Sequence, residues 1–166
     1  MVKILIVEDD PLMLRMYQKI FTLEHYEVDT ATNGEEGVTK AWATPPPTLI
    51  LLDIMMPKMN GLQVLDKLKA DPDKKSIPVI MLTNLSGQQD AEEGLLKGAV
   101  KYIIKSEHEP KEVVTMVKEV LAGYTRNEVP TAATPSSTPE PANTSTPTTT
   151  PSPAPVTSTS ANETVK

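Results

Sequence analysis

The sequence has no cysteine and very few aromatic residues. Its 166 residues include no Cys, one Trp, one Phe and four Tyr. The lack of Cys excludes a disulfide framework, thiol chemistry and a zinc–thiolate site. No apolar run approaches the length of a membrane span, and the N-terminus carries no signal-peptide pattern. We therefore expect a cytoplasmic protein without a membrane segment.

Positive charge is also scarce. The 16 Lys and Arg residues are outnumbered by 22 Asp and Glu, which gives a net charge of -6. The net charge is -4 up to Arg126 and -2 beyond it. An acidic domain without a basic stripe argues against nucleic acid as a ligand.

The composition changes after Arg126. Residues 127–166 hold eight of the 16 prolines and 17 Ser or Thr, but no aromatic residue. Such a segment buries too little apolar surface to offset the entropy of ordering the chain. We expect one folded domain over residues 1–123 and a disordered Pro/Ser/Thr-rich tail over residues 124–166.

Short apolar runs alternate with helical patterns along the folded part. Strands are expected at residues 2–7, 26–32, 49–52, 77–82 and 102–104. Helices are expected from Pro11, over 35–43, over 62–68, around 91–95 and from Pro110. The pairs Asn33-Gly34 and Asn60-Gly61 predict turns, and Gly98 predicts a left-handed helix cap. This alternation is typical of an α/β fold with a parallel sheet covered on both faces.

Polar residues stand where the apolar runs stop. Glu8 and Asp9 follow the first run, Asp53 the third, Thr83 the fourth and Lys105 the fifth. The carboxyl ends of parallel strands share one rim of the sheet, so these side chains should converge there. Three converging carboxylates repel one another unless a cation joins them. All are hard oxygen ligands, which favours Mg²⁺, and the whole set suits phosphoryl transfer.

These motifs together resemble the receiver domain of response regulators in two-component signalling, including the chemotaxis type. The matching stretches are residues 7–10, 52–53, 56–57, 61, 82–83, 98–99 and 102–105, within roughly 1–123. The resemblance implies a flavodoxin-like, doubly wound, five-stranded parallel sheet of order 2-1-3-4-5 with five helices. It also implies a phosphorylation-dependent switch in a phosphorelay.

The resemblance assigns roles to individual residues. Asp53 would accept the phosphoryl group, and Mg²⁺ would be held by Glu8, Asp9, Asp53 and the backbone carbonyl of Met55. Glu8 would support the ion through water.

Three further residues would contact the phosphoryl group or respond to it. Thr83 would donate its hydroxyl to it, and Lys105 would pair with its oxygens. Tyr102 would turn inward when Thr83 moves.

The resemblance also implies partners. The phosphoryl donor would be a sensor histidine kinase or a phosphotransfer protein. A downstream protein would bind the face formed by the fourth helix, the fifth strand and the fifth helix. The protein would be a monomer or a weak, phosphorylation-dependent dimer. It would not be an enzyme beyond phosphorylating and dephosphorylating itself.

Two other functions stay open. The chain would be a docking module if it never carries phosphate. It would be a phosphatase if Asp53 were the nucleophile of a haloacid-dehalogenase-like enzyme, although that class has a second Asp where this chain has Met55.

Three positions depart from the family's usual pattern. Ser106 follows Lys105 where a proline in a cis bond is frequent, which leaves the geometry of this bond open. Asn84 follows Thr83 where small residues are common. Bulky Met55 stands two residues after Asp53, and we hypothesise that it hinders attacking water and prolongs the life of the acyl phosphate.

Overall fold

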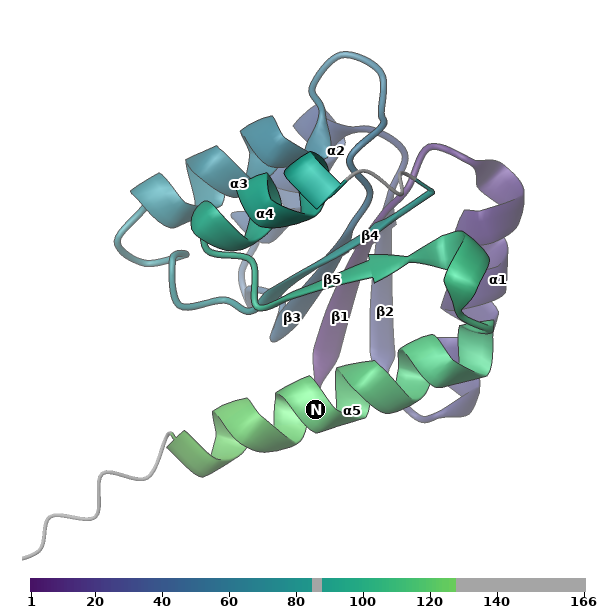
Figure 1. The fold of residues 1–166 in the computed structure, drawn as a ribbon. Helices are drawn as coiled ribbons and strands as arrows, with labels where there is room; N and C mark the ends of the chain where they lie inside the picture. Colours follow the sequence, from purple (N-terminus) through teal and green to yellow (C-terminus); the bar gives the residue numbers. More distant parts are fainter. Residues whose placement is uncertain (85–87, 128–166) are drawn as a thin grey trace, which may run out of the picture. The chain divides into compact units, whose positions relative to one another are not determined.

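The computed structural model describes residues 1–84 and 88–127. Within them, five parallel strands form one sheet of order β2-β1-β3-β4-β5 (Figure 1). The strands are β1 (Lys3–Val7), β2 (Glu27–Ala31), β3 (Leu49–Leu52), β4 (Val79–Thr83) and β5 (Lys101–Ile104). The helices are α1 (Pro11–Leu23), α2 (Gly34–Ala41), α3 (Gly61–Ala70), α4 (Gln88–Leu96) and α5 (Pro110–Asn127). The predicted α/β fold, strand order and number of helices are confirmed.

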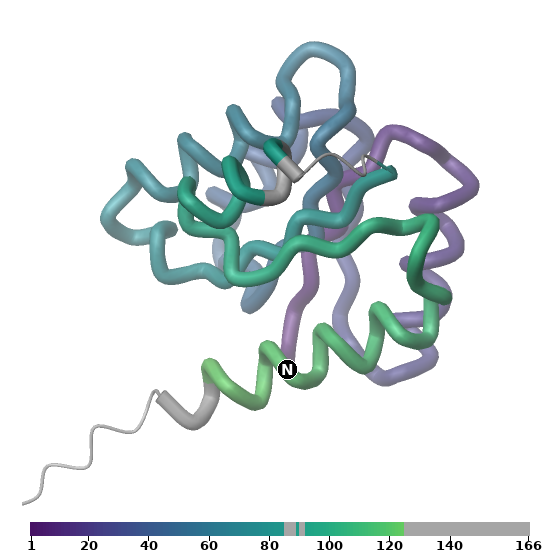
Figure 2. The backbone as a smooth tube through the Cα atoms, viewed as in Figure 1, coloured from purple at the N-terminus to yellow at the C-terminus, as the bar shows by residue number. Residues whose placement is uncertain are grey.

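Helices cover both faces of the sheet, and each face has its own core. On one face, alternate residues of β1 and β3 pack with α1 and α5; on the other, the remaining ones pack with α2 and α3 (Figure 1). The backbone trace in Figure 2 follows this winding from purple β1, an inner strand next to the edge strand β2, to green α5. The strands β1, β3 and β4 are almost fully buried, which explains why their sequences read as unbroken apolar runs.

Polar side chains fix where three helices begin. Asp10 caps α1 and accepts hydrogen bonds from the amides of Leu12 and Met13. Asn33 caps α2, and Asn60 caps α3 in a capping box with Gln63. The Asn-Gly pairs at 33–34 and 60–61 therefore start helices directly, because Asn at an N-cap satisfies amides that the first turn leaves unpaired.

Several boundaries differ from the sequence expectation. Strand β4 begins at Val79 because Pro78 lacks an amide hydrogen, and Ile77 instead closes a turn onto the Lys74 carbonyl. A short 3₁₀ helix, η1 (Lys105–Glu107), follows β5 and was not predicted. Helix α5 extends to Asn127, four residues past the predicted domain boundary at 123. The rest of the predicted tail lies outside the described residues.

Two backbone expectations concern single residues. Gly98 adopts a positive φ of 97° after α4, which confirms the predicted left-handed cap. Among the described residues the one cis peptide bond is Thr44-Pro45, so the bond between Lys105 and Ser106 is trans. Over the same ranges, no helix is both long and apolar enough to cross a membrane.

The capping geometry leads to a stability prediction. Asp10→Ala removes both hydrogen bonds to the first turn of α1 and should lower the free energy of unfolding by about 1 kcal/mol in urea titrations. Glu119→Ala, at an exposed position within α5, is the control and should change it by less than about 0.5 kcal/mol. Equal effects of the two substitutions would show that Asp10 does not stabilise the helix.

Candidate functional site

The parallel register brings four strand ends to one rim of the sheet, where β4 and β5 run two residues beyond the end of β3. Val7 pairs with Leu52, and Thr83 pairs with Ile104. The residues that follow these positions are therefore neighbours in space although they lie far apart in sequence. Backbone hydrogen bonds fix two of them, since the Asp53 amide donates to the Val7 carbonyl and the Glu8 amide donates to the Ala31 carbonyl, each at 3.0 Å.

Three carboxylates gather at this rim, as the sequence predicted. Oxygens of Glu8, Asp9 and Asp53 lie within 4.8 Å of one another. Glu8 and Asp53 are buried, whereas Asp9 is exposed. A hollow of about 380 Å³ opens above them, lined also by Met55, Thr83 and Asn84. The cluster is thus accessible from solvent through its exposed member and this hollow.

The Lys105 ammonium bridges two of these carboxylates. Its Nζ lies 2.5 Å from Glu8 Oε2 and 2.7 Å from Asp53 Oδ2. Burial alone lowers the pKa of Lys105, but the hydrogen bonds to Asp53 and Glu8 outweigh it and hold this pKa above its usual value. Lys105 therefore stays protonated and joins the ends of β1, β3 and β5.

The site disfavours the charged form of Glu8. Burial raises the pKa of Glu8 to about 7, although Lys105 opposes this shift, and the neighbouring charge of Asp53 adds to it. The same charges act on the buried Tyr17 hydroxyl. Burial, together with the charges of Glu8 and Asp53, raises the pKa of Tyr17 to about 12. The rim therefore carries excess negative charge even with Lys105 in place.

The loop after β3 contributes backbone as well as side chain. The Met55 amide donates to Asp53 Oδ1 at 3.2 Å and orients this carboxylate. The Met55 side chain is exposed and lines the hollow, as the hypothesis about water access requires. That the Met55 carbonyl binds a metal stays a prediction.

The two predicted switch residues lie on neighbouring strands. Thr83 is the last residue of β4, fully buried, and lines the hollow. Tyr102 is half-buried on β5, pairs in register with Met81 and packs against the α2/α3 side of the core. Thr83 is thus at the site, whereas Tyr102 lies beside it on the adjacent strand, and their roles stay predictions.

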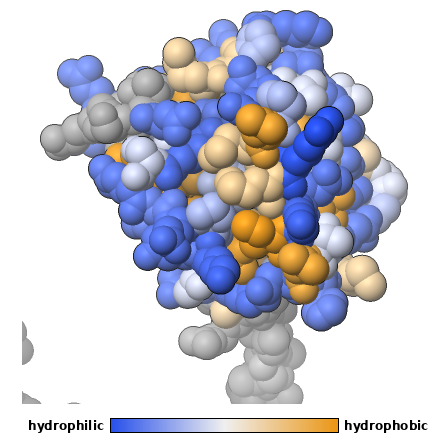
Figure 3. Space-filling view, turned by 90° about the vertical axis from the view of Figure 1, so that its right-hand side faces the viewer, coloured by the Kyte–Doolittle hydropathy of each residue, from blue (hydrophilic) through white to orange (hydrophobic). Residues whose placement is uncertain are grey.

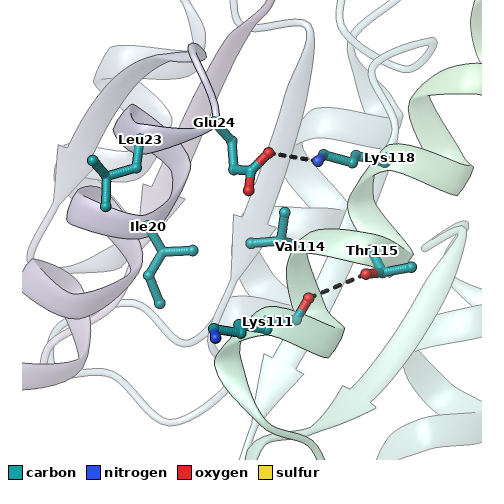
Figure 4. A pocket seen from close by; sticks show the side chains of 7 residues that line it. All are labelled: Ile20, Leu23, Glu24, Lys111, Val114, Thr115 and Lys118. Atoms are coloured by element: carbon teal, nitrogen blue, oxygen red, sulfur yellow. Dashed lines mark hydrogen bonds and ion pairs between the residues drawn. The ribbon is translucent and has the colours of Figure 1, made fainter.

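A second hollow lies away from the rim, between α1 and α5 (Figure 4). It is lined by Ile20, Leu23, Glu24, Lys111, Val114, Thr115 and Lys118. Figure 3 shows the side on which α1 lies in Figure 1, with apolar surface flanked by hydrophilic residues. The charged groups here include a surface ion pair of Glu24 with Lys118 at 2.5 Å, without a carboxylate cluster. The rim is therefore the better candidate for chemistry.

The rim fits a hard divalent cation. It offers carboxylate oxygens close together, an excess of negative charge and open space for further oxygen ligands. The fold and rim together define a doubly wound α/β domain with an acidic site at the carboxyl edge of its sheet.

Comparison with known proteins identifies the family. The family model of the response regulator receiver domain matches residues 4–118. A receiver protein of the CheY-like type from Methanospirillum hungatei superposes with a TM-score of 0.71 at 30% identity, covering 76% of this chain and 98% of its own. The chain therefore belongs to the response regulator receiver family of two-component systems. Receiver domains in general bind Mg²⁺ at an acidic pocket and act as switches.

The curated relatives are longer proteins. Response regulator PleD of Caulobacter vibrioides is 42% identical over 103 residues, which are 62% of this chain and 22% of PleD. A probable transcriptional regulator, ycf27 of Cyanophora paradoxa, is 38% identical over 83% of this chain and 54% of its own length. The chain thus spans about half or less of these relatives. Because one of them is named a transcriptional regulator, the absence of nucleic-acid contact stays a prediction.

The raised pKa of Glu8 predicts a pH dependence of stability. In the folded protein the Glu8 carboxyl keeps its proton up to about pH 7, because its pKa is raised from the usual value of 4.5. The contribution of this proton to folding stability is therefore fully present below pH 4.5 and is lost as pH rises through about 7. As pH rises from about 5 to about 8, the free energy of unfolding of Glu8→Gln should increase by about 2 kcal/mol relative to that of the unsubstituted protein.

Urea unfolding in the presence of a chelator measures this difference across the pH range. Asp9→Asn, which removes the exposed carboxylate, serves as the control and should keep the pH dependence of the unsubstituted protein. Parallel pH profiles for Glu8→Gln and the unsubstituted protein would contradict the prediction.

Proposed function

We propose that this chain is a phosphorylation-dependent switch that accepts a phosphoryl group on Asp53 and passes the signal to a protein partner. The observation that carries the proposal is the environment of Asp53. This buried carboxylate accepts hydrogen bonds from Lys105 and from the Met55 amide, and two further carboxylates lie beside it. A structural ion pair alone does not need three carboxylates beneath an open hollow.

The proposed reaction is transfer of a phosphoryl group to one Asp53 oxygen. That oxygen attacks phosphorus, the bond from phosphorus to the donor breaks, and the donor leaves with its electron pair. The donor is the imidazole of a histidine kinase or phosphotransfer protein. In this proposal, Lys105 neutralises charge on the transferred oxygens, and the Thr83 hydroxyl donates to one of them.

We infer that Glu8, Asp9 and Asp53 hold Mg²⁺, with the Met55 carbonyl as a further ligand. When bound, the ion would neutralise negative charge at the acceptor and at the phosphoryl oxygens. The residues of this chain supply the rest. Glu8 must lose its proton to bind a cation, and Lys105 must share its Glu8 contact with the ion.

The switch follows from the added charge at Asp53. A phosphoryl group draws Lys105 and Thr83 toward its oxygens, which alters the end of β4 and allows Tyr102 on β5 to change rotamer. The proposed readout surface is the face formed by α4, β5 and α5. Leu95 and Leu96 of α4 have exposed side chains, and we propose them as apolar contacts for a partner. We infer a monomer or a weak phosphorylation-dependent dimer acting in the cytoplasm.

Acetyl phosphate with Mg²⁺ tests the proposal directly. Intact-protein mass spectrometry should show one added phosphoryl group on the unsubstituted protein and none on Asp53→Asn. Lys105→Gln should label at least about tenfold more slowly, because it lacks the cation that neutralises the transition state. Labelling of Asp53→Asn, or no labelling without a loss of fold, would overturn the proposal, and the latter result would favour the docking module.

Met55 gives a second test, of phosphoryl lifetime. Its exposed side chain lines the hollow through which water reaches Asp53, so Met55→Asn should speed loss of the phosphoryl group by about tenfold. Phosphate release from the purified acyl phosphate measures this rate. Lys58→Asn, in the same loop but outside the lining of the hollow, is the matched control. An unchanged rate in Met55→Asn would refute the idea that Met55 shields the acyl phosphate.

A further inference from the structure

Gly34, the first residue of α2, lies directly against the loop that follows β3. A Cβ atom built on Gly34 would stand 2.2 Å from the backbone oxygen of Met59, and 2.9 Å from both its carbonyl carbon and its Cβ. Gly34 is buried, so the loop and the start of α2 are in contact with no space for another atom.

The contact, and not backbone freedom, requires glycine at this position. Gly34 is a helical residue without a positive φ, whereas the left-handed glycine of the described residues is Gly98. Alanine would otherwise be the better helix former. An added Cβ at Gly34 would need to move Met59 by about 1 Å to reach ordinary contact distance, since the first obstacle is backbone and not a flexible side chain.

The loop that Gly34 touches is short and constrained, so displacement at one side passes to the other. The Gly61 amide donates to the Ile54 carbonyl at 2.9 Å and closes the loop. At its tip, Lys58 holds a φ of 68°, an uncommon conformation for a residue other than glycine. The same loop carries Met55, whose amide orients the Asp53 carboxylate.

We propose that Gly34 is a positioning residue for the acidic site: it allows the loop after β3 to lie on the start of α2, and this seat fixes Met55 relative to Asp53. The proposal rests on the proposed function for its effect on metal binding and phosphorylation. It adds the junction between β2 and α2, on a different crossover of the fold, to the set of elements that determine the geometry at Asp53.

The seat is steric and not electrostatic. Next to Gly34, Glu35 forms an ion pair with Lys58 at 3.7 Å, but both side chains are largely exposed. Exposed pairs of this kind hold little energy. Removing the charge at Glu35 should therefore leave the loop in place, which makes Glu35→Gln a control at the neighbouring residue.

Gly34→Ala is the test variant, and Gly98→Ala is the matched control for destabilisation. Gly98→Ala strains a left-handed residue packed on Lys69, after α4 and outside the lining of the hollow. Two quantities are measured on the full chain: the Mg²⁺ concentration that half-saturates the protein in calorimetry, and the ¹H–¹⁵N shifts of residues 53–59 without metal. We expect Gly34→Ala to raise the half-saturating concentration by about tenfold and to shift these amides. Glu35→Gln and Gly98→Ala should leave both unchanged.

The outcomes separate the two proposals. If Gly34→Ala lowers only thermal stability, with Mg²⁺ affinity and amide shifts unchanged, Gly34 has a purely structural role and the inference is wrong. If the unsubstituted protein neither binds Mg²⁺ nor labels with acetyl phosphate, the proposed function itself is wrong.

A second variant covers the case in which Gly34→Ala does not fold. Met59→Gly removes the Cβ that lies against Gly34, while the closer backbone oxygen remains, and it gives the loop backbone more freedom at this contact. It should also raise the half-saturating Mg²⁺ concentration, and an unchanged value would overturn the inference.

Discussion

One buried cation determines how the site is built. Lys105 lies between Glu8 and Asp53 and bonds to both, so it joins three strand ends that the chain reaches at widely separated positions. Buried charges persist only where partners compensate their lost hydration. Here one ammonium faces two buried carboxylates and a third, exposed one, which leaves the rim short of positive charge. A divalent cation would neutralise this excess of negative charge. The same excess makes the site responsive to added charge.

The sheet makes this arrangement possible because it fixes the backbone of the strand ends, whose following side chains lie together at one edge. Parallel pairing aligns the ends of β1, β3, β4 and β5, and the apolar interior of the strands anchors them on both faces. The loops beyond the rim are held by smaller features. Asn60 caps α3, and Gly34 gives the preceding loop a place to lie. Rigid strands thus supply the reactive groups, and helix starts hold the loops around them.

Much of this was predictable from sequence, for a physical reason. Buried parallel strands leave unbroken apolar runs, and the first polar residue after each run marks the rim, so Glu8, Asp53 and Lys105 could be grouped before any coordinates. The strand order came from the resemblance to a family, because hydrophobic pattern does not specify which strands are neighbours. Helix starts were misread as turns at Asn33 and Asn60, since the same residues favour both.

Distances could not be predicted. Nothing in the sequence indicated that Glu8 bonds Lys105 directly, a contact between residues 97 positions apart in sequence. The contact between Met59 and Gly34 could not be predicted from the sequence, in which only the glycine itself is visible. Close approach of two segments depends on the assembled fold. The account is tested most directly by a crystal structure of the protein with Mg²⁺ and beryllium fluoride. It predicts fluoride on Asp53, the ion among Glu8, Asp9 and Asp53, and the Lys105 ammonium moved from Glu8 to fluoride. Lys105 still bridging Glu8 and Asp53, with neither ion nor fluoride at the rim, would contradict it.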